Sequence, residues 1–299
     1  MKVVLTGGTG FIGTALVPRL LASGHEVCLL GRKRPGSMPP STAFTAWPSL
    51  QQEPPVEGLR GADVVVHLAG EPVAQRWTPE VKRRIRQSRV EGTLNLARSL
   101  ANLSRPPMVL VCASAIGIYG LRGDEILTES SAPGQDFLAE TTAEWEQAAE
   151  SAAALGIRVA KIRTGIVLGK NGGALKKMLP PFRFGLGGPI GSGRQWMSWI
   201  HLDDIVGLFL YALENPSLRG PVNGVAPNPV TNADFTRALG SALRRPAILP
   251  VPALAIKLMF GEMGDVILGS QRVMPRAAEE AGYQFKYPEL GPALASILQ

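Results

Sequence analysis

Three glycines near the N-terminus have the spacing of a phosphate-binding turn. Gly7, Gly10 and Gly13 follow the apolar run Val3–Leu5 and open a segment with helical apolar spacing. Glycine permits turns that a Cβ forbids, and a helix that begins there directs free N–H groups and its positive dipole end at one place. The pattern predicts a strand, a turn and a helix that bind a dinucleotide pyrophosphate. The alternative is a merely tight strand-to-helix turn.

The residues after the second expected strand, His25–Leu30, indicate which dinucleotide binds. NAD-binding folds usually place an acid about 20 residues after the glycines, where it binds the ribose hydroxyls. Here the chain has Gly31, Arg32 and Lys33, followed by Arg34, and no acid. Cations attract a phosphate, and a guanidinium pairs with it in a bidentate geometry. The segment favours NADP over NAD, with a solvated basic loop as the alternative.

Two side chains further along have reactive or charged groups near the same expected site. Ser114 follows an expected strand, Met108–Ala113, and the carboxyl end of such a strand faces the ligand crevice of an open α/β sheet. A hydroxyl that caps the strand is the alternative. Arg89 lies in a helix expected over 78–100, within reach of a cofactor phosphate.

A glycine-rich stretch, 184–193, cannot form regular structure. Long loops of this composition often carry function. We therefore expect it to contact a small-molecule substrate, together with Arg194 and Gln195 directly behind it.

The composition limits the class of protein. The 299 residues are 45% hydrophobic, enough for a full core, and the net charge of +7 suits anionic ligands. Basic residues are scattered apart from two clusters, which does not indicate nucleic acid. The two cysteines lie in apolar runs and the three histidines are far apart, so we expect no metal and a reducing cytoplasm. No apolar run approaches the ~18 residues of a membrane helix, and no signal peptide is evident.

Buried strand-like runs alternate with helical segments, which is the pattern of an α/β protein. Ala69 and Gly70 follow the run Val64–Leu68, and small residues there would let a cofactor lie against the backbone. The expected strands and helices cover residues 3–5, 25–30, 43–47, 64–68, 108–113 and 158–168, and 11–23, 78–100, 137–154 and 201–214.

Several motifs now stand in order along the chain. They are Gly7-x-x-Gly10-x-x-Gly13, His67-Leu68-Ala69-Gly70, Gly92-Thr93-x-Asn95-Leu96, Ser114 with Tyr119-Gly120, Arg163-Thr164-Gly165 and His201-x-Asp203-Asp204. The whole chain resembles the extended short-chain dehydrogenases/reductases, relatives of nucleotide-sugar epimerases. The tail from Ile248 is similar to an atypical epimerase subgroup, often labelled cell-division-inhibitor homologues, a label that we do not carry over as a function.

This resemblance implies a Rossmann-type doubly wound parallel sheet that binds NADP, formed by 1–169 and 199–215. It implies a smaller C-terminal α/β substrate domain, formed by 170–198 and 216–299. The residues that it assigns to the cofactor are Gly7, Thr9, Gly10, Phe11, Ile12 and Gly13 at the pyrophosphate, Leu68, Ala69 and Gly70 at the adenosine and ribose, and Arg89, Arg163 and Thr164 by their places in the motifs.

The chain departs from this family at the proton relay, a tyrosine followed four residues later by a lysine. None of the four tyrosines has that lysine, and the helix from Phe137 offers phenylalanine and threonine instead. Ser114 remains as the catalytic candidate and could polarise a carbonyl. Asp136 and Glu140 are candidates for proton transfer that no spacing distinguishes.

Three functions stay open. The first is an NADP-dependent oxidoreductase or epimerase-like enzyme that acts on a carbonyl or nucleotide-sugar-type substrate with nonstandard acid/base groups. The second is a regulator that senses NADP(H) and moves no hydride, and the third is a scaffold with a vestigial site. The glycine turn and the basic segment disfavour the third, and the glycine loop and Ser114 favour the first. Substrate identity and self-association are left open.

Overall fold

The computed structural model describes residues 1–36 and 38–299. A seven-stranded sheet forms its centre, in the order β11-β7-β5-β4-β1-β2-β3, and all neighbouring pairs are parallel. The strands are β1 (Lys2–Thr6), β2 (Glu26–Gly31), β3 (Ala43–Ala46), β4 (Val64–His67), β5 (Val109–Ala115), β7 (Arg158–Thr164) and β11 (Gly220–Gly224). This arrangement confirms the predicted Rossmann-type doubly wound sheet.

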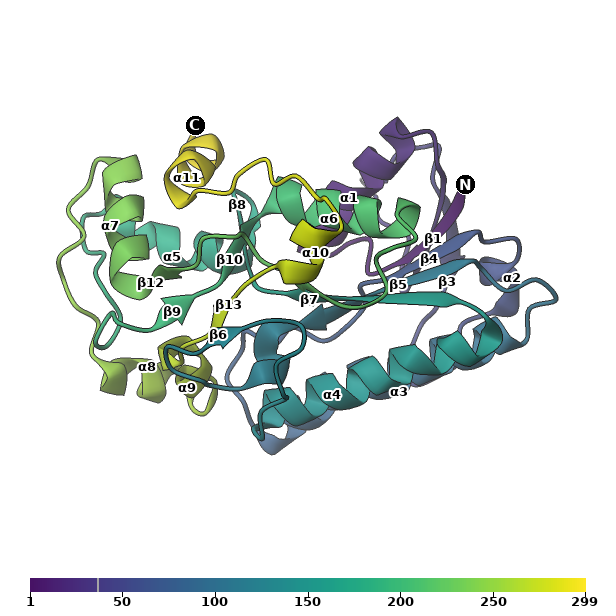
Figure 1. The fold of residues 1–299 in the computed structure, drawn as a ribbon, viewed down its shortest axis with the longest axis horizontal. Helices are drawn as coiled ribbons and strands as arrows, with labels where there is room; N and C mark the ends of the chain where they lie inside the picture. Colours follow the sequence, from purple (N-terminus) through teal and green to yellow (C-terminus); the bar gives the residue numbers. More distant parts are fainter. Residues whose placement is uncertain (37) are drawn as a thin grey trace.

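Helices cover both faces of the sheet, which explains why its central strands are apolar throughout. On one face lie α1 (Phe11–Ala22) and α6 (Leu202–Glu214); on the other, α3 (Pro79–Ala101) runs beside α4 (Phe137–Glu150) (Figure 1). As predicted, α3 begins at Thr78, whose Oγ1 accepts a hydrogen bond from the Val81 N–H.

The strand order reverses at β1, and this places the ligand site. From β1 the chain proceeds to β2 and β3 on one side, then returns to β4 and β5 on the other. Connections on opposite sides leave a crevice at the carboxyl ends of β1 and β4. The glycine turn after β1 lies at this crevice.

A second, smaller core lies beside the carboxyl edge of the sheet (Figure 1). Its buried side chains include Leu179, Phe235 and Leu294. The elements of this region and of its connections are α5 (Gly173–Arg183), β8 (Ile166–Gly169), β9 (Trp196–Met197), β10 (Trp199–His201), β12 (Val230–Thr231), α7 (Asn232–Leu243), α8 (Ala253–Phe260), α9 (Met263–Leu268) and α11 (Leu290–Leu298). The expected division placed 216–299 in this region, whereas β11 is an edge strand of the central sheet.

Three differences from the expected elements have physical causes. The expected strand 158–168 is broken at Gly165, where a Cβ would lie 2.5 Å from the Ser198 carbonyl oxygen, and β8 leaves the central sheet to pair with β10. Helix α5 was not among the expected elements, and it contains two prolines. The loop 120–136 contains β6 (Ile126–Leu127), which pairs with β13 (Arg272–Val273) ahead of α10 (Arg276–Glu280).

The remaining segments are α2 (Val56–Leu59), the 3-10 helices η1 (Ile116–Tyr119) and η2 (Ser151–Leu155), and the irregular glycine stretch 184–193. Among residues 1–36 and 38–299, no helix is both long and apolar enough to cross a bilayer.

Candidate active site

The glycine turn has the geometry of a pyrophosphate cradle. Gly7 has a φ of +71°, and a Cβ there would lie 2.6 Å from the Leu68 carbonyl carbon. At Gly13 a Cβ would lie 2.3 Å from the Gly7 oxygen, so this glycine lets α1 pack against the turn. A Cβ at Gly10 would approach only Gly7, at 3.2 Å, because Gly10 otherwise faces a cavity.

The N-terminus of α1 makes this cradle suited to binding an anion. No side chain caps the helix, and its first turn contains no acidic residue. Its free N–H groups and dipole therefore favour a phosphate. Phe11, Ile12 and Gly13 line the cavity with Gly7 and Gly10, whereas Thr9 is exposed within the turn. The backbone and the space around it fit the pyrophosphate of a dinucleotide.

A single cavity of about 740 Å³ extends from this turn to the C-terminal region. Beyond the turn it passes Leu68 and Arg89, then Ser114 at the end of β5 and Thr164 at the end of β7. Its far end is closed by α8 and α9, through Ile256 and other apolar side chains. Leu68, Ser114 and Thr164, which are predicted site residues at the ends of three different strands, thus line the same cavity.

The basic segment lies outside the cavity lining, directly after β2. Gly31 is the last residue of this strand, and Arg32, Lys33 and Arg34 are exposed. Within the described part of the chain, none of these three cations has an ion-pair partner. They are thus available to a phosphate near the carboxyl end of β2.

Arg89 is held in place by the segment after β4. Its Nη1 donates to the Glu71 carbonyl oxygen at 2.9 Å, and its guanidinium lies 5.2 Å from the Trp145 ring centroid. A Cβ at Gly70 would lie 3.5 Å from the same guanidinium. Burial lowers the pKa of Arg89 to about 10, with the charge of Glu71 opposing, so it stays charged at neutral pH. Arg89 therefore carries a positive charge into the lining beside Leu68, Ala69 and Gly70.

His67 supports the turn and does not enter the cavity lining. Its Nδ1 lies 2.7 Å from Thr6 Oγ1, which also accepts from the Ala69 N–H, and its Nε2 lies 3.1 Å from Thr93 Oγ1. Burial lowers the pKa of His67 to about 4. The ring is neutral and links β1, β4 and α3 beneath the cofactor cradle, as expected for a packed core histidine.

Ser114 is bonded to a buried ion pair. Its hydroxyl donates to Glu146 Oε1 at 2.6 Å, and Arg163 donates to both Glu146 oxygens, from Nε at 2.8 Å and from Nη2 at 2.9 Å. Burial disfavours the charged guanidinium, but the bonds and charge of Glu146 outweigh it and raise the pKa of Arg163. Arg163 also donates to the Tyr119 hydroxyl, which donates to Asn223.

The structure therefore does not place Arg163, a predicted cofactor contact, in the cavity. Its guanidinium donates to Glu146, to the Tyr119 hydroxyl and to the Glu129 carbonyl oxygen, and it is the counter-charge of Glu146. Its neighbour Thr164 does line the cavity. Glu146 was not among the predicted site residues. The helical spacing Thr142, Glu146, Ala149 places it on the buried face of α4, and this was the signal available.

The helix that the resemblance expects to carry the tyrosine and lysine contributes other side chains to the cavity. Leu138, Thr141 and Thr142 of α4 line it. Phe137 instead packs against Trp77, with ring centroids 5.2 Å apart. Asp136 caps α4, accepting from the Leu138 and Ala139 N–H groups, and Glu140 is exposed. The cavity lining places neither carboxylate beside Ser114.

The predicted substrate residues Arg194 and Gln195 are not part of the lining either. Arg194 is exposed, and Gln195 is buried with its Nε2 donating to the Ile190 carbonyl oxygen. Gln195 shapes the glycine loop from within, because glycines provide no side chains to fix it. Ile190 and Trp196, on either side of this pair, do reach the cavity. The apolar contribution of α8 and α9 was missed because neither helix carries a chemical motif.

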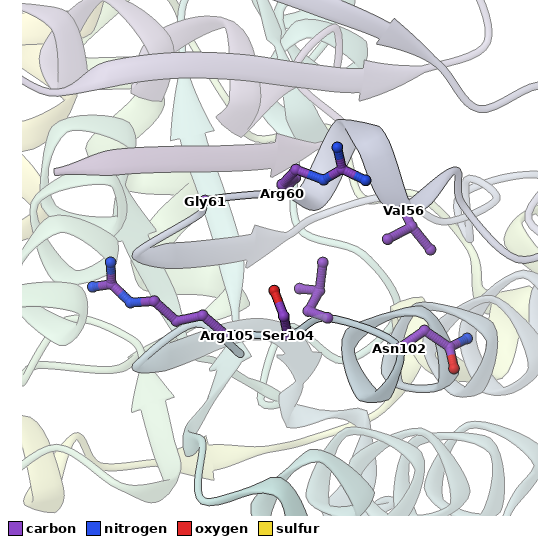
Figure 2. A pocket seen from close by; sticks show the side chains of 7 residues that line it. Val56, Arg60, Gly61, Asn102, Ser104 and Arg105 are labelled. Atoms are coloured by element: carbon purple, nitrogen blue, oxygen red, sulfur yellow. The ribbon is translucent and has the colours of Figure 1, made fainter.

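A second, smaller pocket of about 240 Å³ lies at the opposite edge of the sheet. Figure 2 shows Arg60 and Gly61, which precede β4, across from Ser104 and Arg105, which precede β5. Amino ends of parallel strands face away from the ligand crevice. This pocket is therefore separate from the candidate active site.

The fold, the cradle and the cavity define a Rossmann-type dinucleotide-binding protein. Comparisons with known proteins specify the family. The model of the NAD dependent epimerase/dehydratase family matches residues 3–223, and that of a domain of unknown function (DUF1731) matches residues 251–297. The chain belongs to the NAD-dependent epimerase/dehydratase family, in agreement with the resemblance seen in its motifs.

Relatives match the chain over its whole length. An epimerase family protein SDR39U1 homologue from Arabidopsis thaliana, named as chloroplastic, is 44% identical over 100% of this chain and 87% of its own. The epimerase family protein YfhF of Bacillus subtilis is 38% identical over 100% of this chain and 98% of its own. The crystal structure of human SDR39U1 with NADPH superposes with a TM-score of 0.89, at 38% identity and 99% coverage of both chains.

Proposed function

We propose that this protein is an NADP(H)-dependent oxidoreductase that interconverts a carbonyl compound and its alcohol beside Ser114. The observation that carries the proposal is the single cavity that joins the glycine turn to the Ser114 hydroxyl. The human relative of similar structure was crystallised with NADPH, which supports the choice of cofactor.

Each part of the cofactor has residues suited to it. The turn and the α1 N-terminus would hold the pyrophosphate, and Arg32 and Lys33 would hold the 2′-phosphate. Leu68, Ala69 and Gly70 follow β4, where a dinucleotide passes along the crevice. When bound, the nicotinamide supplies or accepts the hydride.

Ser114 is proposed as the catalytic residue because it lines the cavity and its hydroxyl is hydrogen-bonded to an ionisable side chain, Glu146. Since its proton is directed at Glu146, its oxygen is available to accept a hydrogen bond from a substrate alcohol. In oxidation, the alcohol proton moves to Ser114 Oγ while the Ser114 proton moves to Glu146 Oε1, and the hydride leaves the carbon. Reduction runs the same transfers in reverse, and Arg163 holds Glu146 in position throughout.

Two measurements on the full chain test this proposal. Calorimetry should show that NADPH binds more tightly than NADH. NADPH deuterated at the transferred position should then pass one deuterium to a product, detected by mass spectrometry across a panel of ketones, aldehydes and nucleotide sugars.

Ser114→Ala provides the control, because it removes the hydroxyl and leaves the cradle intact. It should keep the affinity for NADPH and lower turnover by about 10²–10⁴-fold, the usual contribution of general acid–base catalysis. Tight NADPH binding with no deuterium transfer to any panel member would overturn the enzyme proposal and favour a protein that senses the cofactor.

A further inference from the structure

The lining residues from 178 onwards form a part of the cavity that carries no charged side chain. We call it the apolar chamber and define it by the lining residues contributed from 178 onwards: Met178, Ile190, Trp196, Met197, Ser198, Asn232, Ile256, Phe260, Met263, Val266, Ile267, Gly269 and Gln271. None of these residues carries a formal charge. Nine of the thirteen, including Trp196, have aliphatic, thioether or aromatic side chains, and they come from α8, α9 and the segments facing them.

The three polar side chains of the apolar chamber are already bonded to protein. Asn232 Oδ1 accepts from the Ile190 N–H at 2.7 Å, and its amide donates to Met197 Sδ. The Gln271 amide donates to two backbone carbonyls, and Ser198 Oγ donates to the Gln271 carbonyl oxygen at 2.7 Å. These bonds hold the walls together, and the Gln271 Oε1 atom is left as an acceptor for a neutral polar group.

The two cations of the lining are bonded to one segment of backbone. Arg89 and Lys177 are the two charged residues that line the cavity in the described ranges, and both donate to carbonyls of the segment after β4, at Glu71 and Ala74. Arg89 stands beside Gly70, where the cofactor is expected. Lys177 directly precedes Met178 of the apolar chamber on α5, and its ammonium is directed at the Ala74 carbonyl oxygen.

A nucleoside diphosphate sugar would be poorly matched to these walls. Its diphosphate carries two negative charges, and burying a charge without a partner costs far more than a hydrogen bond returns. A neutral, apolar molecule would instead gain from every methylene that leaves water. Ligand sites with mostly apolar walls and few polar groups bind such molecules by area and orient them at one end.

We infer that the substrate is a neutral, predominantly apolar carbonyl compound or alcohol, whose oxygen contacts Ser114 and whose hydrocarbon part fills the apolar chamber. This inference names the substrate class of the proposed function and rests on it. The two sides of helix α8 face different environments, and this supports the assignment. Ile256 is buried and Phe260 lines the chamber, whereas Leu258 is 67% exposed on the opposite side of the same helix.

Binding, measured separately from turnover, tests the substrate class. NADPH-loaded protein is titrated with the neutral dye Nile red, which is then displaced by hexan-2-one, octan-2-one and decan-2-one. Affinity should rise about three- to fourfold for each added methylene, as expected for about 0.8 kcal/mol per buried CH₂. UDP-glucose and UDP-glucuronic acid, titrated by calorimetry, should not bind at concentrations that saturate the ketones.

Two variants on one helix locate the effect. Phe260→Ala should weaken decan-2-one about tenfold or more and leave NADPH affinity unchanged, because its ring lies in the chamber and not at the cradle. Leu258→Ala, on the exposed face, should change neither affinity. Met263→Ala, from α9, repeats the test if Phe260→Ala fails to fold.

The outcomes separate this inference from the proposed function. Tight binding of a UDP-sugar, or ketone affinities that do not depend on chain length and on Phe260, overturns the apolar substrate class whether or not the protein turns over. Chain-length-dependent binding without hydride transfer supports the class and overturns the oxidoreductase.

Discussion

The Ser114 hydroxyl and the Glu146 carboxylate are joined across β5 and α4 by a hydrogen bond of 2.6 Å. Glu146 lies behind Ser114 as seen from the cavity and is itself fixed by Arg163 of β7. The family resemblance predicts an acid/base pair within one helix, one turn apart. Here the ionisable group is on the helix, the hydroxyl is on the strand, and the counter-charge comes from the next strand.

Glu146→Gln should strongly destabilise the protein. It keeps the shape of the side chain but leaves the buried Arg163 without a counter-charge, and breaking a buried pair in this way typically costs about 3–5 kcal/mol. Urea unfolding followed by circular dichroism measures the free energy of unfolding.

Glu150→Gln is the matched control for that variant, on the same helix. The Glu150 side chain is 52% exposed while its partner Lys161 is 11% exposed, so its loss should lower the free energy of unfolding by much less than the loss of Glu146. Replacing Glu146 and Arg163 together by Gln and Met should recover part of the loss. If Glu146→Gln and Glu150→Gln lowered the free energy of unfolding equally, the Glu146–Arg163 pair would contribute no more than an exposed ion pair.

Much of the scaffold could be predicted because its signals are local. The apolar runs and the glycine turn define β1, α1 and the crevice, and Thr78-Pro79 marks the start of α3. Ser114 lines the cavity, at the end of a parallel strand, where the strand's direction fixes its location.

The remaining features of the site depend on tertiary contacts. Arg163 lies in a motif that the family resemblance assigns to the site. Only the packing of α4 against β7 shows that its guanidinium is paired with Glu146. Gln195 is adjacent to the glycine-rich stretch 184–193 in sequence, yet its side chain turns inward and donates to the Ile190 carbonyl oxygen. The walls from α8 contain ordinary apolar residues, so composition alone could not distinguish a ligand chamber from a core.

Arg32→Ala should separate NADP from NAD. A hydrogen bond to a charged group contributes about 1.5–3 kcal/mol, so NADPH affinity should fall about ten- to hundredfold while NADH affinity stays the same. Arg60→Ala removes the same charge at the opposite edge of the sheet and should affect neither (Figure 2). Calorimetry on both variants measures the ratio of the NADPH affinity to the NADH affinity. An equal loss for the two cofactors would mean that Arg32 does not contact the 2′-phosphate.

Gly10→Val should abolish binding of both cofactors. Gly10 faces the cavity, so a valine side chain would occupy the space where the pyrophosphate is expected. The fold has little reason to change, because a Cβ at this position would approach only the Gly7 oxygen, at 3.2 Å. Gly291→Ala, in an open position of α11, is the control and should bind NADPH normally. Unchanged titration curves for Gly10→Val would exclude the turn as the cofactor cradle.

His67 should make the protein sensitive to acid. Burial lowers its pKa from 6.5 to about 4, so below pH 6.5 the unfolded chain takes up a proton that the folded chain does not. The associated stability is fully present above pH 6.5 and is lost as the pH falls toward 4. The loss amounts to about 3 kcal/mol, because each pH unit between the unfolded and folded pKa values contributes about 1.36 kcal/mol.

Two variants assign this acid sensitivity to the imidazole. His67→Gln cannot titrate, so its free energy of unfolding should fall less steeply between pH 6.5 and 4 than that of the wild type. Thr93→Val removes a hydrogen-bond partner but keeps the imidazole, and should lower stability at every pH while retaining the wild-type slope. Denaturant unfolding at a series of pH values measures both slopes, and a His67→Gln slope equal to that of the wild type would assign the acid sensitivity to other groups.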